Sequence, residues 1–123
     1  MNLKIGNDII ETERIKKAFA EHGDKFKKRI FTDNEIAYCE EKGENKYQSY
    51  AARFAAKEAI FKAISEVLEN KYSVSWTDIE ILNDENGKPH ATIKDVDFVE
   101  CVDISLSHVK DFAIATAIVN IVK

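Results

Sequence analysis

Three charged residues from two separate segments could together act on a phosphate group. Asp8 lies near the end of a segment that alternates like a β-strand, and Glu58 and Lys62 lie one helical turn apart further along. Mg²⁺ prefers one or two protein carboxylates together with waters and substrate phosphates, and a nearby lysine can neutralise phosphate charge. The alternative is an ordinary Glu58–Lys62 helix pair, with Asp8 capping the helix that follows. Spacing alone does not decide between these interpretations.

A second polar group, Ser105, Ser107 and His108, ends a segment of alternating apolar residues. The two serines share one parity and therefore one strand face. Because no Gly-x-Ser-x-Gly elbow surrounds either serine, a nucleophilic serine is disfavoured. His108 could act as a general base or donate to a phosphate, although a single histidine at a turn is more often structural. Glycine-rich phosphate loops are absent from the sequence, so basic side chains and a metal would have to hold a nucleotide.

Basic residues dominate the segment between Arg14 and Arg29, although the whole chain is acidic. It has 18 Lys and Arg against 22 Asp and Glu, and a net charge of -4. This balance argues against nucleic acid as a partner. The basic segment is therefore either a solvated helix surface or a docking surface for an acidic partner.

The first half of the chain predicts one strand followed by three helices, which must position these groups. The expected elements are a strand over 3–10, a helix with Thr12 as its N-cap and Gly23 at its end, a helix over 33–42, and a longer helix over 47–69. The middle helix starts with a capping box, Thr32-Asp33-Asn34-Glu35. The longer helix has two apolar faces, which indicates burial between layers or at a subunit contact.

The second half predicts antiparallel strands. Apolar segments over 79–82 and 91–93 flank an Asn-Gly turn signal and favour a hairpin. A second pair follows over 102–107 and 112–122, and apolar residues of both parities predict that its last strand is buried on both faces. We therefore expect an α+β fold in which the helices pack on one side of an antiparallel sheet. The length predicts a single domain spanning residues 1–123.

Composition excludes several other classes. With 45% apolar residues, 4 Gly and 1 Pro, the chain is typical of a globular protein. No stretch approaches the ~18 apolar residues of a membrane helix, and the first residues lack the layout of a signal peptide, so we expect a cytoplasmic protein with no membrane partner. Cys39 and Cys101 are isolated, which predicts neither a disulfide nor a zinc site.

Six segments match one protein family, in order, over essentially the whole chain. They are Ile5–Glu11, Ile30–Cys39, Arg53–Ala63, Trp76–Ile81, Asn86–Pro89 and Ile104–His108. On these segments the chain resembles holo-acyl-carrier-protein synthase, the short bacterial type of the 4′-phosphopantetheinyl transferase family. The Arg53–Ala63 block and the Gly-x-Asp-x-x-Glu block at Gly6 are the most diagnostic. One departure is Asn7, at a position that is usually apolar in the first motif.

The resemblance implies the 4′-phosphopantetheinyl transferase fold and the corresponding reaction. The phosphopantetheine arm of coenzyme A moves to a serine of apo-acyl carrier protein and adenosine 3′,5′-bisphosphate is released, in support of fatty acid biosynthesis. Asp8 and Glu58 match the family's Mg²⁺ ligands, and Lys62 should meet phosphate charge. Glu58, directly or through a metal-bound water, is the first candidate to accept the serine proton. No covalent enzyme nucleophile is required.

The resemblance also assigns the binding of substrates and partners. Arg53 is a candidate for the 3′-phosphate of coenzyme A, and Ser107 and His108 are expected to contact the same molecule. The basic segment corresponds to the family's docking helix for the acidic carrier protein. The residues expected to steer that partner are Arg14, Lys17, Lys25 and Lys28. Short members of the family form homotrimers with active sites at subunit contacts, which would explain the doubly apolar helix.

Two other functional classes stay open. A catalytically silent module that binds acidic carrier proteins would need the basic segment but neither Asp8 nor Glu58. A metal-dependent nucleotide phosphodiesterase would use the same carboxylates with water as the acceptor. Loss of transfer when the carboxylates are mutated excludes the first class. Release of adenosine 3′,5′-bisphosphate from coenzyme A without a carrier protein would indicate the second.

Overall fold

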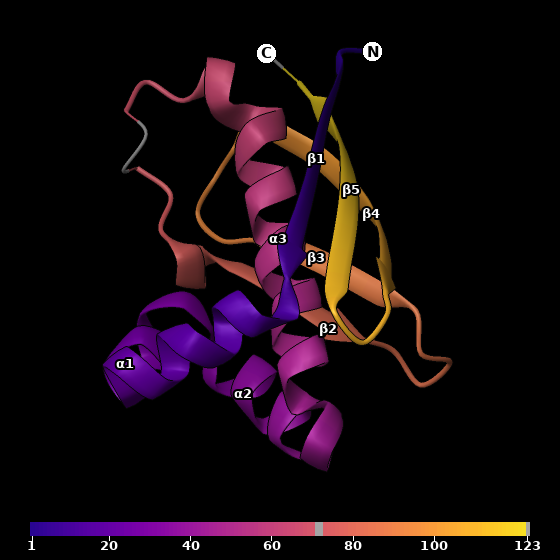
Figure 1. The fold of residues 1–123 in the computed structure, drawn as a ribbon. Coiled ribbons are helices and arrows are strands. Elements are labelled where there is room, and N and C mark those ends of the chain that lie inside the picture. The colour runs from indigo at the N-terminus through magenta and orange to yellow at the C-terminus, as the bar shows by residue number, and fades with distance from the viewer. Residues whose placement is uncertain (71–72, 123) are drawn as a thin grey trace.

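The computed structural model describes residues 1–70 and 73–122, and it has the α+β architecture that the sequence predicts. Its elements are β1 (Leu3–Glu11), α1 (Thr12–Ile30), α2 (Asp33–Glu40), α3 (Lys46–Ile64), β2 (Ile79–Asn83), β3 (Pro89–Ile93), β4 (Val99–His108) and β5 (Phe112–Ile121). The strands are antiparallel and form two sheets, ordered β1-β5-β4 and β2-β3. α3 packs on β1 and β5, and α1 and α2 lie beside one end of α3 (Figure 1).

No helix within residues 1–70 and 73–122 combines the length and apolar character needed to cross a lipid bilayer. Both cysteines are free thiols. Cys39 is buried in the core, whereas Cys101 is exposed on β4.

α3 is the centre of the core, and its two apolar faces are both used within one chain. One face packs against β1 and β5, while other sides contact α1, α2 and β2. Its buried alanines allow the helix and the sheet to approach closely; they are Ala51, Ala52, Ala55, Ala56, Ala59 and Ala63. The helix ends at Ile64, and a 3₁₀ turn follows over Ser65–Val67, so the predicted end at residue 69 is too late. Burial between layers therefore explains this helix without a subunit contact.

The start and end of α1 differ from the prediction. Thr12 is the first helical residue, and Glu11 occupies the N-cap position without a side-chain capping bond. The Thr12 amide instead donates to the Asp111 carbonyl at 2.8 Å, so a contact distant in sequence satisfies the helix end. Gly23 has a φ of 60° and breaks the helix where predicted, but a second helical segment follows at once and continues to Ile30. α1 is thus kinked at Gly23 rather than ended there.

α2 begins with the predicted capping box. The Thr32 hydroxyl accepts from the Glu35 amide at 3.2 Å, and the Glu35 carboxylate accepts from the Thr32 amide at 2.9 Å. The helix ends at Glu40, two residues before the predicted end.

A buried ion pair between Glu35 and Lys57 joins the helices to the hairpin. The two side chains are fully buried and lie 2.7 Å apart, and the second Glu35 oxygen accepts from the Ile81 amide at 2.7 Å. Lys57 also donates to the carbonyls of Ile30 at 2.8 Å and Trp76 at 2.9 Å. Removing one partner of such a pair costs about 3–5 kcal/mol, because the other charge is left buried and unpaired. This network fixes the position of α3.

β5 is buried on one face only, so the prediction of a strand buried on both faces is wrong for the single chain. Its alanines, with Val119 and Ile121, face α3, while alternate residues point to the other side of the sheet. That side carries a group of exposed apolar side chains from β1 and β5, which we call the outer face. It consists of Leu3, Ile5, Ile9, Phe112, Ile114 and Ile118. Apolar residues occur at both odd and even positions of β5, since one set lines the core and the other contributes to the outer face.

Asn7 lies in the middle of the outer face, opposite Thr116 of β5. Its side-chain amide donates to the Thr116 hydroxyl at 2.7 Å and to the Ala115 carbonyl at 3.0 Å. The pairing of β1 with β5 runs without a register shift through this position. The polar residue at a usually apolar position therefore leaves the strand intact.

Candidate active site

Asp8 faces α3 because of strand parity and a close approach at Gly6. Gly6, Asp8 and Ile10 form the inward face of β1. A Cβ on Gly6 would lie 1.8 Å from the main-chain oxygen of Ala59, so only glycine fits there. Since Ala59 follows Glu58 on α3, this contact draws β1 against the segment of helix that carries Glu58.

The structure brings Asp8, Glu58 and Lys62 together. The Lys62 ammonium lies 3.1 Å from Asp8 Oδ1 and 3.0 Å from the Asn7 carbonyl oxygen. Burial raises the pKa of the half-buried Glu58 carboxyl, and the negative charge of Asp8 raises it further, while Lys62 acts in the opposite direction. Lys62 therefore forms an ion pair with Asp8 and not with Glu58, its neighbour one turn away on α3. Asp8 does not cap α1, whose N-cap is Glu11.

The oxygen atoms of this cluster suit a hard cation that keeps other ligands of its own. Within residues 1–70 and 73–122, no group of three or more His, Cys, Asp or Glu side chains is arranged to hold a metal ion. Two carboxylates are too few for a site enclosed by protein ligands, but they match Mg²⁺, which retains waters and binds substrate phosphates. The residues present therefore fit Mg²⁺ and do not resemble a zinc site.

An apolar cavity of about 470 Å³ opens beside Glu58. It is lined by Glu58, Phe61, Ser65, Leu68, Val74, Ser75 and Trp76. The rings of Phe61 and Trp76 meet edge to face, with centroids 5.1 Å apart. Glu58 is the only ionisable group among these lining residues. A molecule bound here would place apolar atoms against the aromatic rings, next to a carboxylate.

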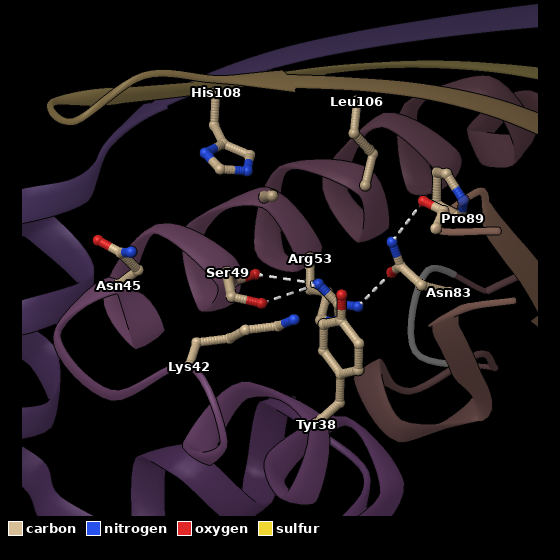
Figure 2. Close-up of a pocket in the computed structure, with 11 residues that line it drawn as sticks. Tyr38, Lys42, Asn45, Ser49, Arg53, Asn83, Pro89, Leu106 and His108 are labelled. Carbon is tan, nitrogen blue, oxygen red and sulfur yellow. Dashed lines mark hydrogen bonds between the residues drawn. The ribbon is translucent and has the colours of Figure 1, made fainter. Parts of the chain in front are cut away.

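Arg53 points into a different cavity, of about 370 Å³, between α2, α3, the β2-β3 hairpin and β4 (Figure 2). Its guanidinium donates to the Ser49 hydroxyl at 3.1 Å and to Asn83 Oδ1 at 2.5 Å, and it lies 4.2 Å from the centre of the Tyr38 ring. Arg53 is buried, and its Nε has no hydrogen-bond partner among the described residues. The Lys42 ammonium lies over the same ring at 4.4 Å.

This second cavity suits an anion. His108 enters it from the end of β4 (Figure 2). Its Nδ1 lies 3.2 Å from the side-chain oxygen of Gln48. Among the described residues that line the cavity there are two cations and a histidine but no carboxylate. Cations in a partly enclosed space without an acidic neighbour attract phosphate groups.

Ser107 does not share the cavity of His108. Adjacent strand residues point to opposite faces, and Ser107 pairs with Ile114 on the side of the sheet that carries the outer face. The site residues on α3 point in different directions: Arg53 and Glu58, five residues apart, are separated by about 140° around the axis of the helix. The predicted site residues therefore form two sets in one chain: Asp8, Glu58 and Lys62 in one, and Arg53 and His108 in the other.

Sequence reasoning missed several residues of the second cavity. Tyr38 and Lys42 have i, i+4 spacing on α2 and just beyond its end, which was an available signal. Asn83 comes from the hairpin, and no local pattern relates it to α3.

The four basic residues predicted to bind a partner lie along α1. Arg14 and Lys17 precede the kink at Gly23, and Lys25 and Lys28 follow it. All four are exposed, and none forms an ion pair with another residue of the described parts of the chain. Lys27 of the same helix, in contrast, pairs with Glu40 at 3.4 Å. The four charges are thus free to face an acidic surface.

Comparison with known proteins shows the family of the chain. Residues 4–117 match the model of the 4′-phosphopantetheinyl transferase superfamily. The chain is 42% identical over 128 residues to a holo-[acyl-carrier-protein] synthase of Ruminiclostridium cellulolyticum, covering 98% of this chain and 94% of that protein. It is 44% identical over 127 residues to one of Clostridium tetani, covering 98% and 97%. The chain belongs to the 4′-phosphopantetheinyl transferase superfamily.

Solved structures are similar in fold. The holo-(acyl-carrier-protein) synthase of Bacillus anthracis, in complex with CoA (3′,5′-ADP), has a TM-score of 0.76 and 39% identity, covering 94% of each chain. The holo-[acyl-carrier-protein] synthase of Helicobacter pylori, in complex with coenzyme A, has a TM-score of 0.81 and 32% identity, covering 94% of this chain and 99% of that one. Both similarities extend over nearly the whole chain.

Proposed function

We propose that this chain transfers the 4′-phosphopantetheine group of coenzyme A to a serine of apo-acyl carrier protein, in support of fatty acid biosynthesis. The products are holo-acyl carrier protein and adenosine 3′,5′-bisphosphate. The observation that carries the proposal is the similarity of nearly the whole chain to holo-[acyl-carrier-protein] synthases. The convergence of Asp8, Glu58 and Lys62 adds a chemical reason, because these are groups that act on phosphate.

The reaction joins the serine oxygen to the phosphorus that bears the pantetheine arm and breaks the bond from that phosphorus to the leaving phosphate. Asp8 and Glu58 would hold Mg²⁺, which when bound supplies Lewis-acid polarisation of the phosphate and neutralises its charge. Glu58 would also accept the proton of the serine hydroxyl as the general base. Lys62 would meet the charge of the leaving phosphate. Positioning and electrostatics account for such a transfer without a covalent intermediate.

The cavity around Arg53 would hold the nucleotide end of coenzyme A. Arg53 and Lys42 would contact the 3′-phosphate, and His108 would complete the set from β4. The unpartnered, buried Nε of Arg53 and the absence of carboxylates among the described lining residues support this assignment. Ser107 keeps its predicted contact with coenzyme A only if the contact is made from the other side of the sheet.

A homotrimer with sites at subunit contacts would complete the active site. Two groups of residues are involved: the cluster of Asp8, Glu58 and Lys62, and the cavity around Arg53, which we call the nucleotide cavity. Within one chain, they open on different sides of α3. The outer face offers six exposed apolar side chains for contact with another copy, including Ile5 at 69% exposure and Ile9 at 60%. A phosphate donor bound to one subunit could then reach the carboxylates of its neighbour. The exposed cations of α1 would steer the acidic carrier protein to the assembled site.

The decisive experiment is intact-mass spectrometry of an apo-acyl carrier protein incubated with this protein, coenzyme A and Mg²⁺, with an EDTA control and an Asp8→Asn variant. A gain of one phosphopantetheinyl group, lost with EDTA and in the variant, supports both the reaction and the metal site. No gain from folded protein that still binds the carrier protein would support the silent module. Release of adenosine 3′,5′-bisphosphate without carrier protein would support the phosphodiesterase.

A further inference from the structure

The ammonium group of Lys62 lies against oxygen atoms of β1. It contacts two hard oxygen atoms, Asp8 Oδ1 at 3.1 Å and the Asn7 carbonyl oxygen at 3.0 Å. Glu58, one helical turn before Lys62, provides a second carboxylate close enough to Asp8 to feel its charge. Lysine therefore neutralises the same cluster of oxygens that fits a divalent cation.

We infer that Lys62 is an internal cation that holds Asp8 in the metal-free protein, and that a divalent cation displaces it and so frees its ammonium group for substrate phosphates. This inference rests on the metal site of the proposed function. Lys62 would thus compete with the metal for Asp8 first and assist the transfer afterwards. Binding of the metal would then prepare the phosphate-binding lysine in the same step.

The exposures of the two side chains favour this exchange. The Asp8 side chain is only 16% exposed and is held between β1 and α3, whereas the Lys62 side chain is 53% exposed. An ion pair with one partner so exposed is weak, because water screens the attraction and the long side chain loses entropy when it is fixed. The flexible stem of lysine allows its charge to move away without disturbing α3. Repulsion between the ammonium group and an arriving divalent ion would drive that movement.

Two simpler roles for Lys62 lead to different expectations. A lysine that only fixes β1 to α3 would stay on Asp8 after metal binding. A lysine that only binds phosphate would leave metal affinity unchanged in the absence of coenzyme A. Competition predicts both that removing the ammonium group strengthens metal binding without coenzyme A and that the ammonium group leaves Asp8 when the metal binds.

The test measures Mn²⁺ binding to the full chain without coenzyme A, by electron paramagnetic resonance of the free ion at low salt. We expect Lys62→Gln to bind Mn²⁺ about twofold to fivefold more tightly than the wild type, the factor that corresponds to losing an exposed ion pair. Lys62→Arg, which keeps a cation, should stay near the wild type. Lys4→Gln is the matched control, because Lys4 lies on β1, the strand of Asp8, and pairs with Glu66 instead. It removes one charge without touching Asp8, and its affinity should also stay near the wild type.

A second measurement follows Lys62 itself. In protein labelled with ¹⁵N-lysine, the Nζ signal of Lys62, identified by its loss in Lys62→Gln, should shift during a Mg²⁺ titration with the midpoint of metal binding. Equal or weaker Mn²⁺ binding by Lys62→Gln, or a Lys62 signal that does not move as the site fills, would overturn the inference while the metal site stands. Binding that Asp8→Asn does not weaken would overturn the inference together with the proposed metal site.

Discussion

The α-carbon of Gly6 faces the main-chain carbonyl of Ala59 so closely that a methyl group on Gly6 would lie 1.8 Å from the carbonyl oxygen. This contact joins the strand that carries Asp8 to the helix that carries Glu58. The two carboxylates come from segments about fifty residues apart, so their meeting depends on how closely strand and helix approach. Gly6 is therefore as important for the site as the charged residues.

Gly6→Ala should destabilise the protein by about 3 kcal/mol or more, because rigid backbone cannot give way to the added methyl group as a side chain can. Denaturant-induced unfolding measures the change, and transfer activity should fall as Asp8 moves away from Glu58. Gly43→Ala is the control: Gly43 has a φ of 58° and nothing within 4 Å of an added Cβ. Its cost should be only the backbone strain, about 1–2 kcal/mol. A Gly6→Ala protein as stable as the control would contradict the close approach.

The proposed binding of coenzyme A in the Arg53 cavity predicts a selective effect on the donor. Lys42→Gln should raise KM for coenzyme A about tenfold, equivalent to ~1.4 kcal/mol, because an exposed cation on the Tyr38 ring is lost from the proposed 3′-phosphate site. KM for 3′-dephospho-coenzyme A, which lacks that phosphate, should change little. Lys94→Gln, an exposed lysine outside the cavity, is the matched control. Equal losses with both donors would show that Lys42 acts elsewhere.

Local patterns predicted the elements that short-range physics determines. The capping box at Thr32 and the break at Gly23 depend on hydrogen bonds and backbone freedom within a few residues, and both are present. The predicted cap at Thr12 was wrong because a carbonyl from the turn between β4 and β5 satisfies the helix end instead. Apolar residues on both parities of β5 were read as two buried faces, since a sequence cannot distinguish a core from an exposed apolar face.

The candidate site was predictable only in part, because packing between distant segments brings its residues together. Asp8, Glu58 and Lys62 were found from residue types and from the family resemblance, and the structure places them in contact range. The partner of Lys62 was not predictable, because helical spacing favoured Glu58 whereas the packing of β1 provides Asp8. The buried Glu35–Lys57 pair had no local signal, since its partners come from α2, α3 and β2.

The proposed docking role of α1 predicts a salt-dependent effect. Arg14→Glu should raise KM for the carrier protein about tenfold at low ionic strength and leave KM for coenzyme A unchanged, because an exposed steering charge is reversed. The difference should shrink when salt reduces the screening length to below about 8 Å. Lys94→Glu reverses an exposed charge outside α1 and should have a much smaller effect. If Arg14→Glu kept the wild-type KM at low salt, α1 would be an ordinary solvated helix.

The pair Glu40–Tyr50 predicts how stability depends on pH. The Tyr50 hydroxyl donates to the Glu40 carboxylate at 2.6 Å, and this bond, with help from Lys46 and Lys27, lowers the pKa of Glu40. A lowered folded pKa means that the stabilisation is present above the ordinary glutamate pKa of about 4.3 and is lost as the pH falls through the folded value. Glu40→Gln should therefore lower the free energy of unfolding by about 1 kcal/mol near neutral pH, because it removes a hydrogen bond to a charged but partly exposed carboxylate. In acid the change should be small.

Urea unfolding near neutral pH and below the folded pKa would measure both values for Glu40→Gln. Glu44→Gln, at an exposed position nearby, should show no such change. A cost that is the same at both pH values would mean that Glu40 acts through packing rather than charge.

The outer face predicts the oligomeric state. Ile118 is 43% exposed on that face, in register with Ile5 of β1. Burying a lysine there without a partner is unfavourable, so Ile118→Lys should convert the proposed trimer into single chains that keep their circular dichroism spectrum. The separated chains should lose transfer activity, because the carboxylates and the nucleotide cavity of one chain open on different sides of α3. Val109→Lys, at an exposed apolar position in the turn before β5, should leave the assembly unchanged. Light scattering coupled to size-exclusion chromatography gives the mass of each species, and a fully active wild-type monomer would contradict the proposed subunit contact.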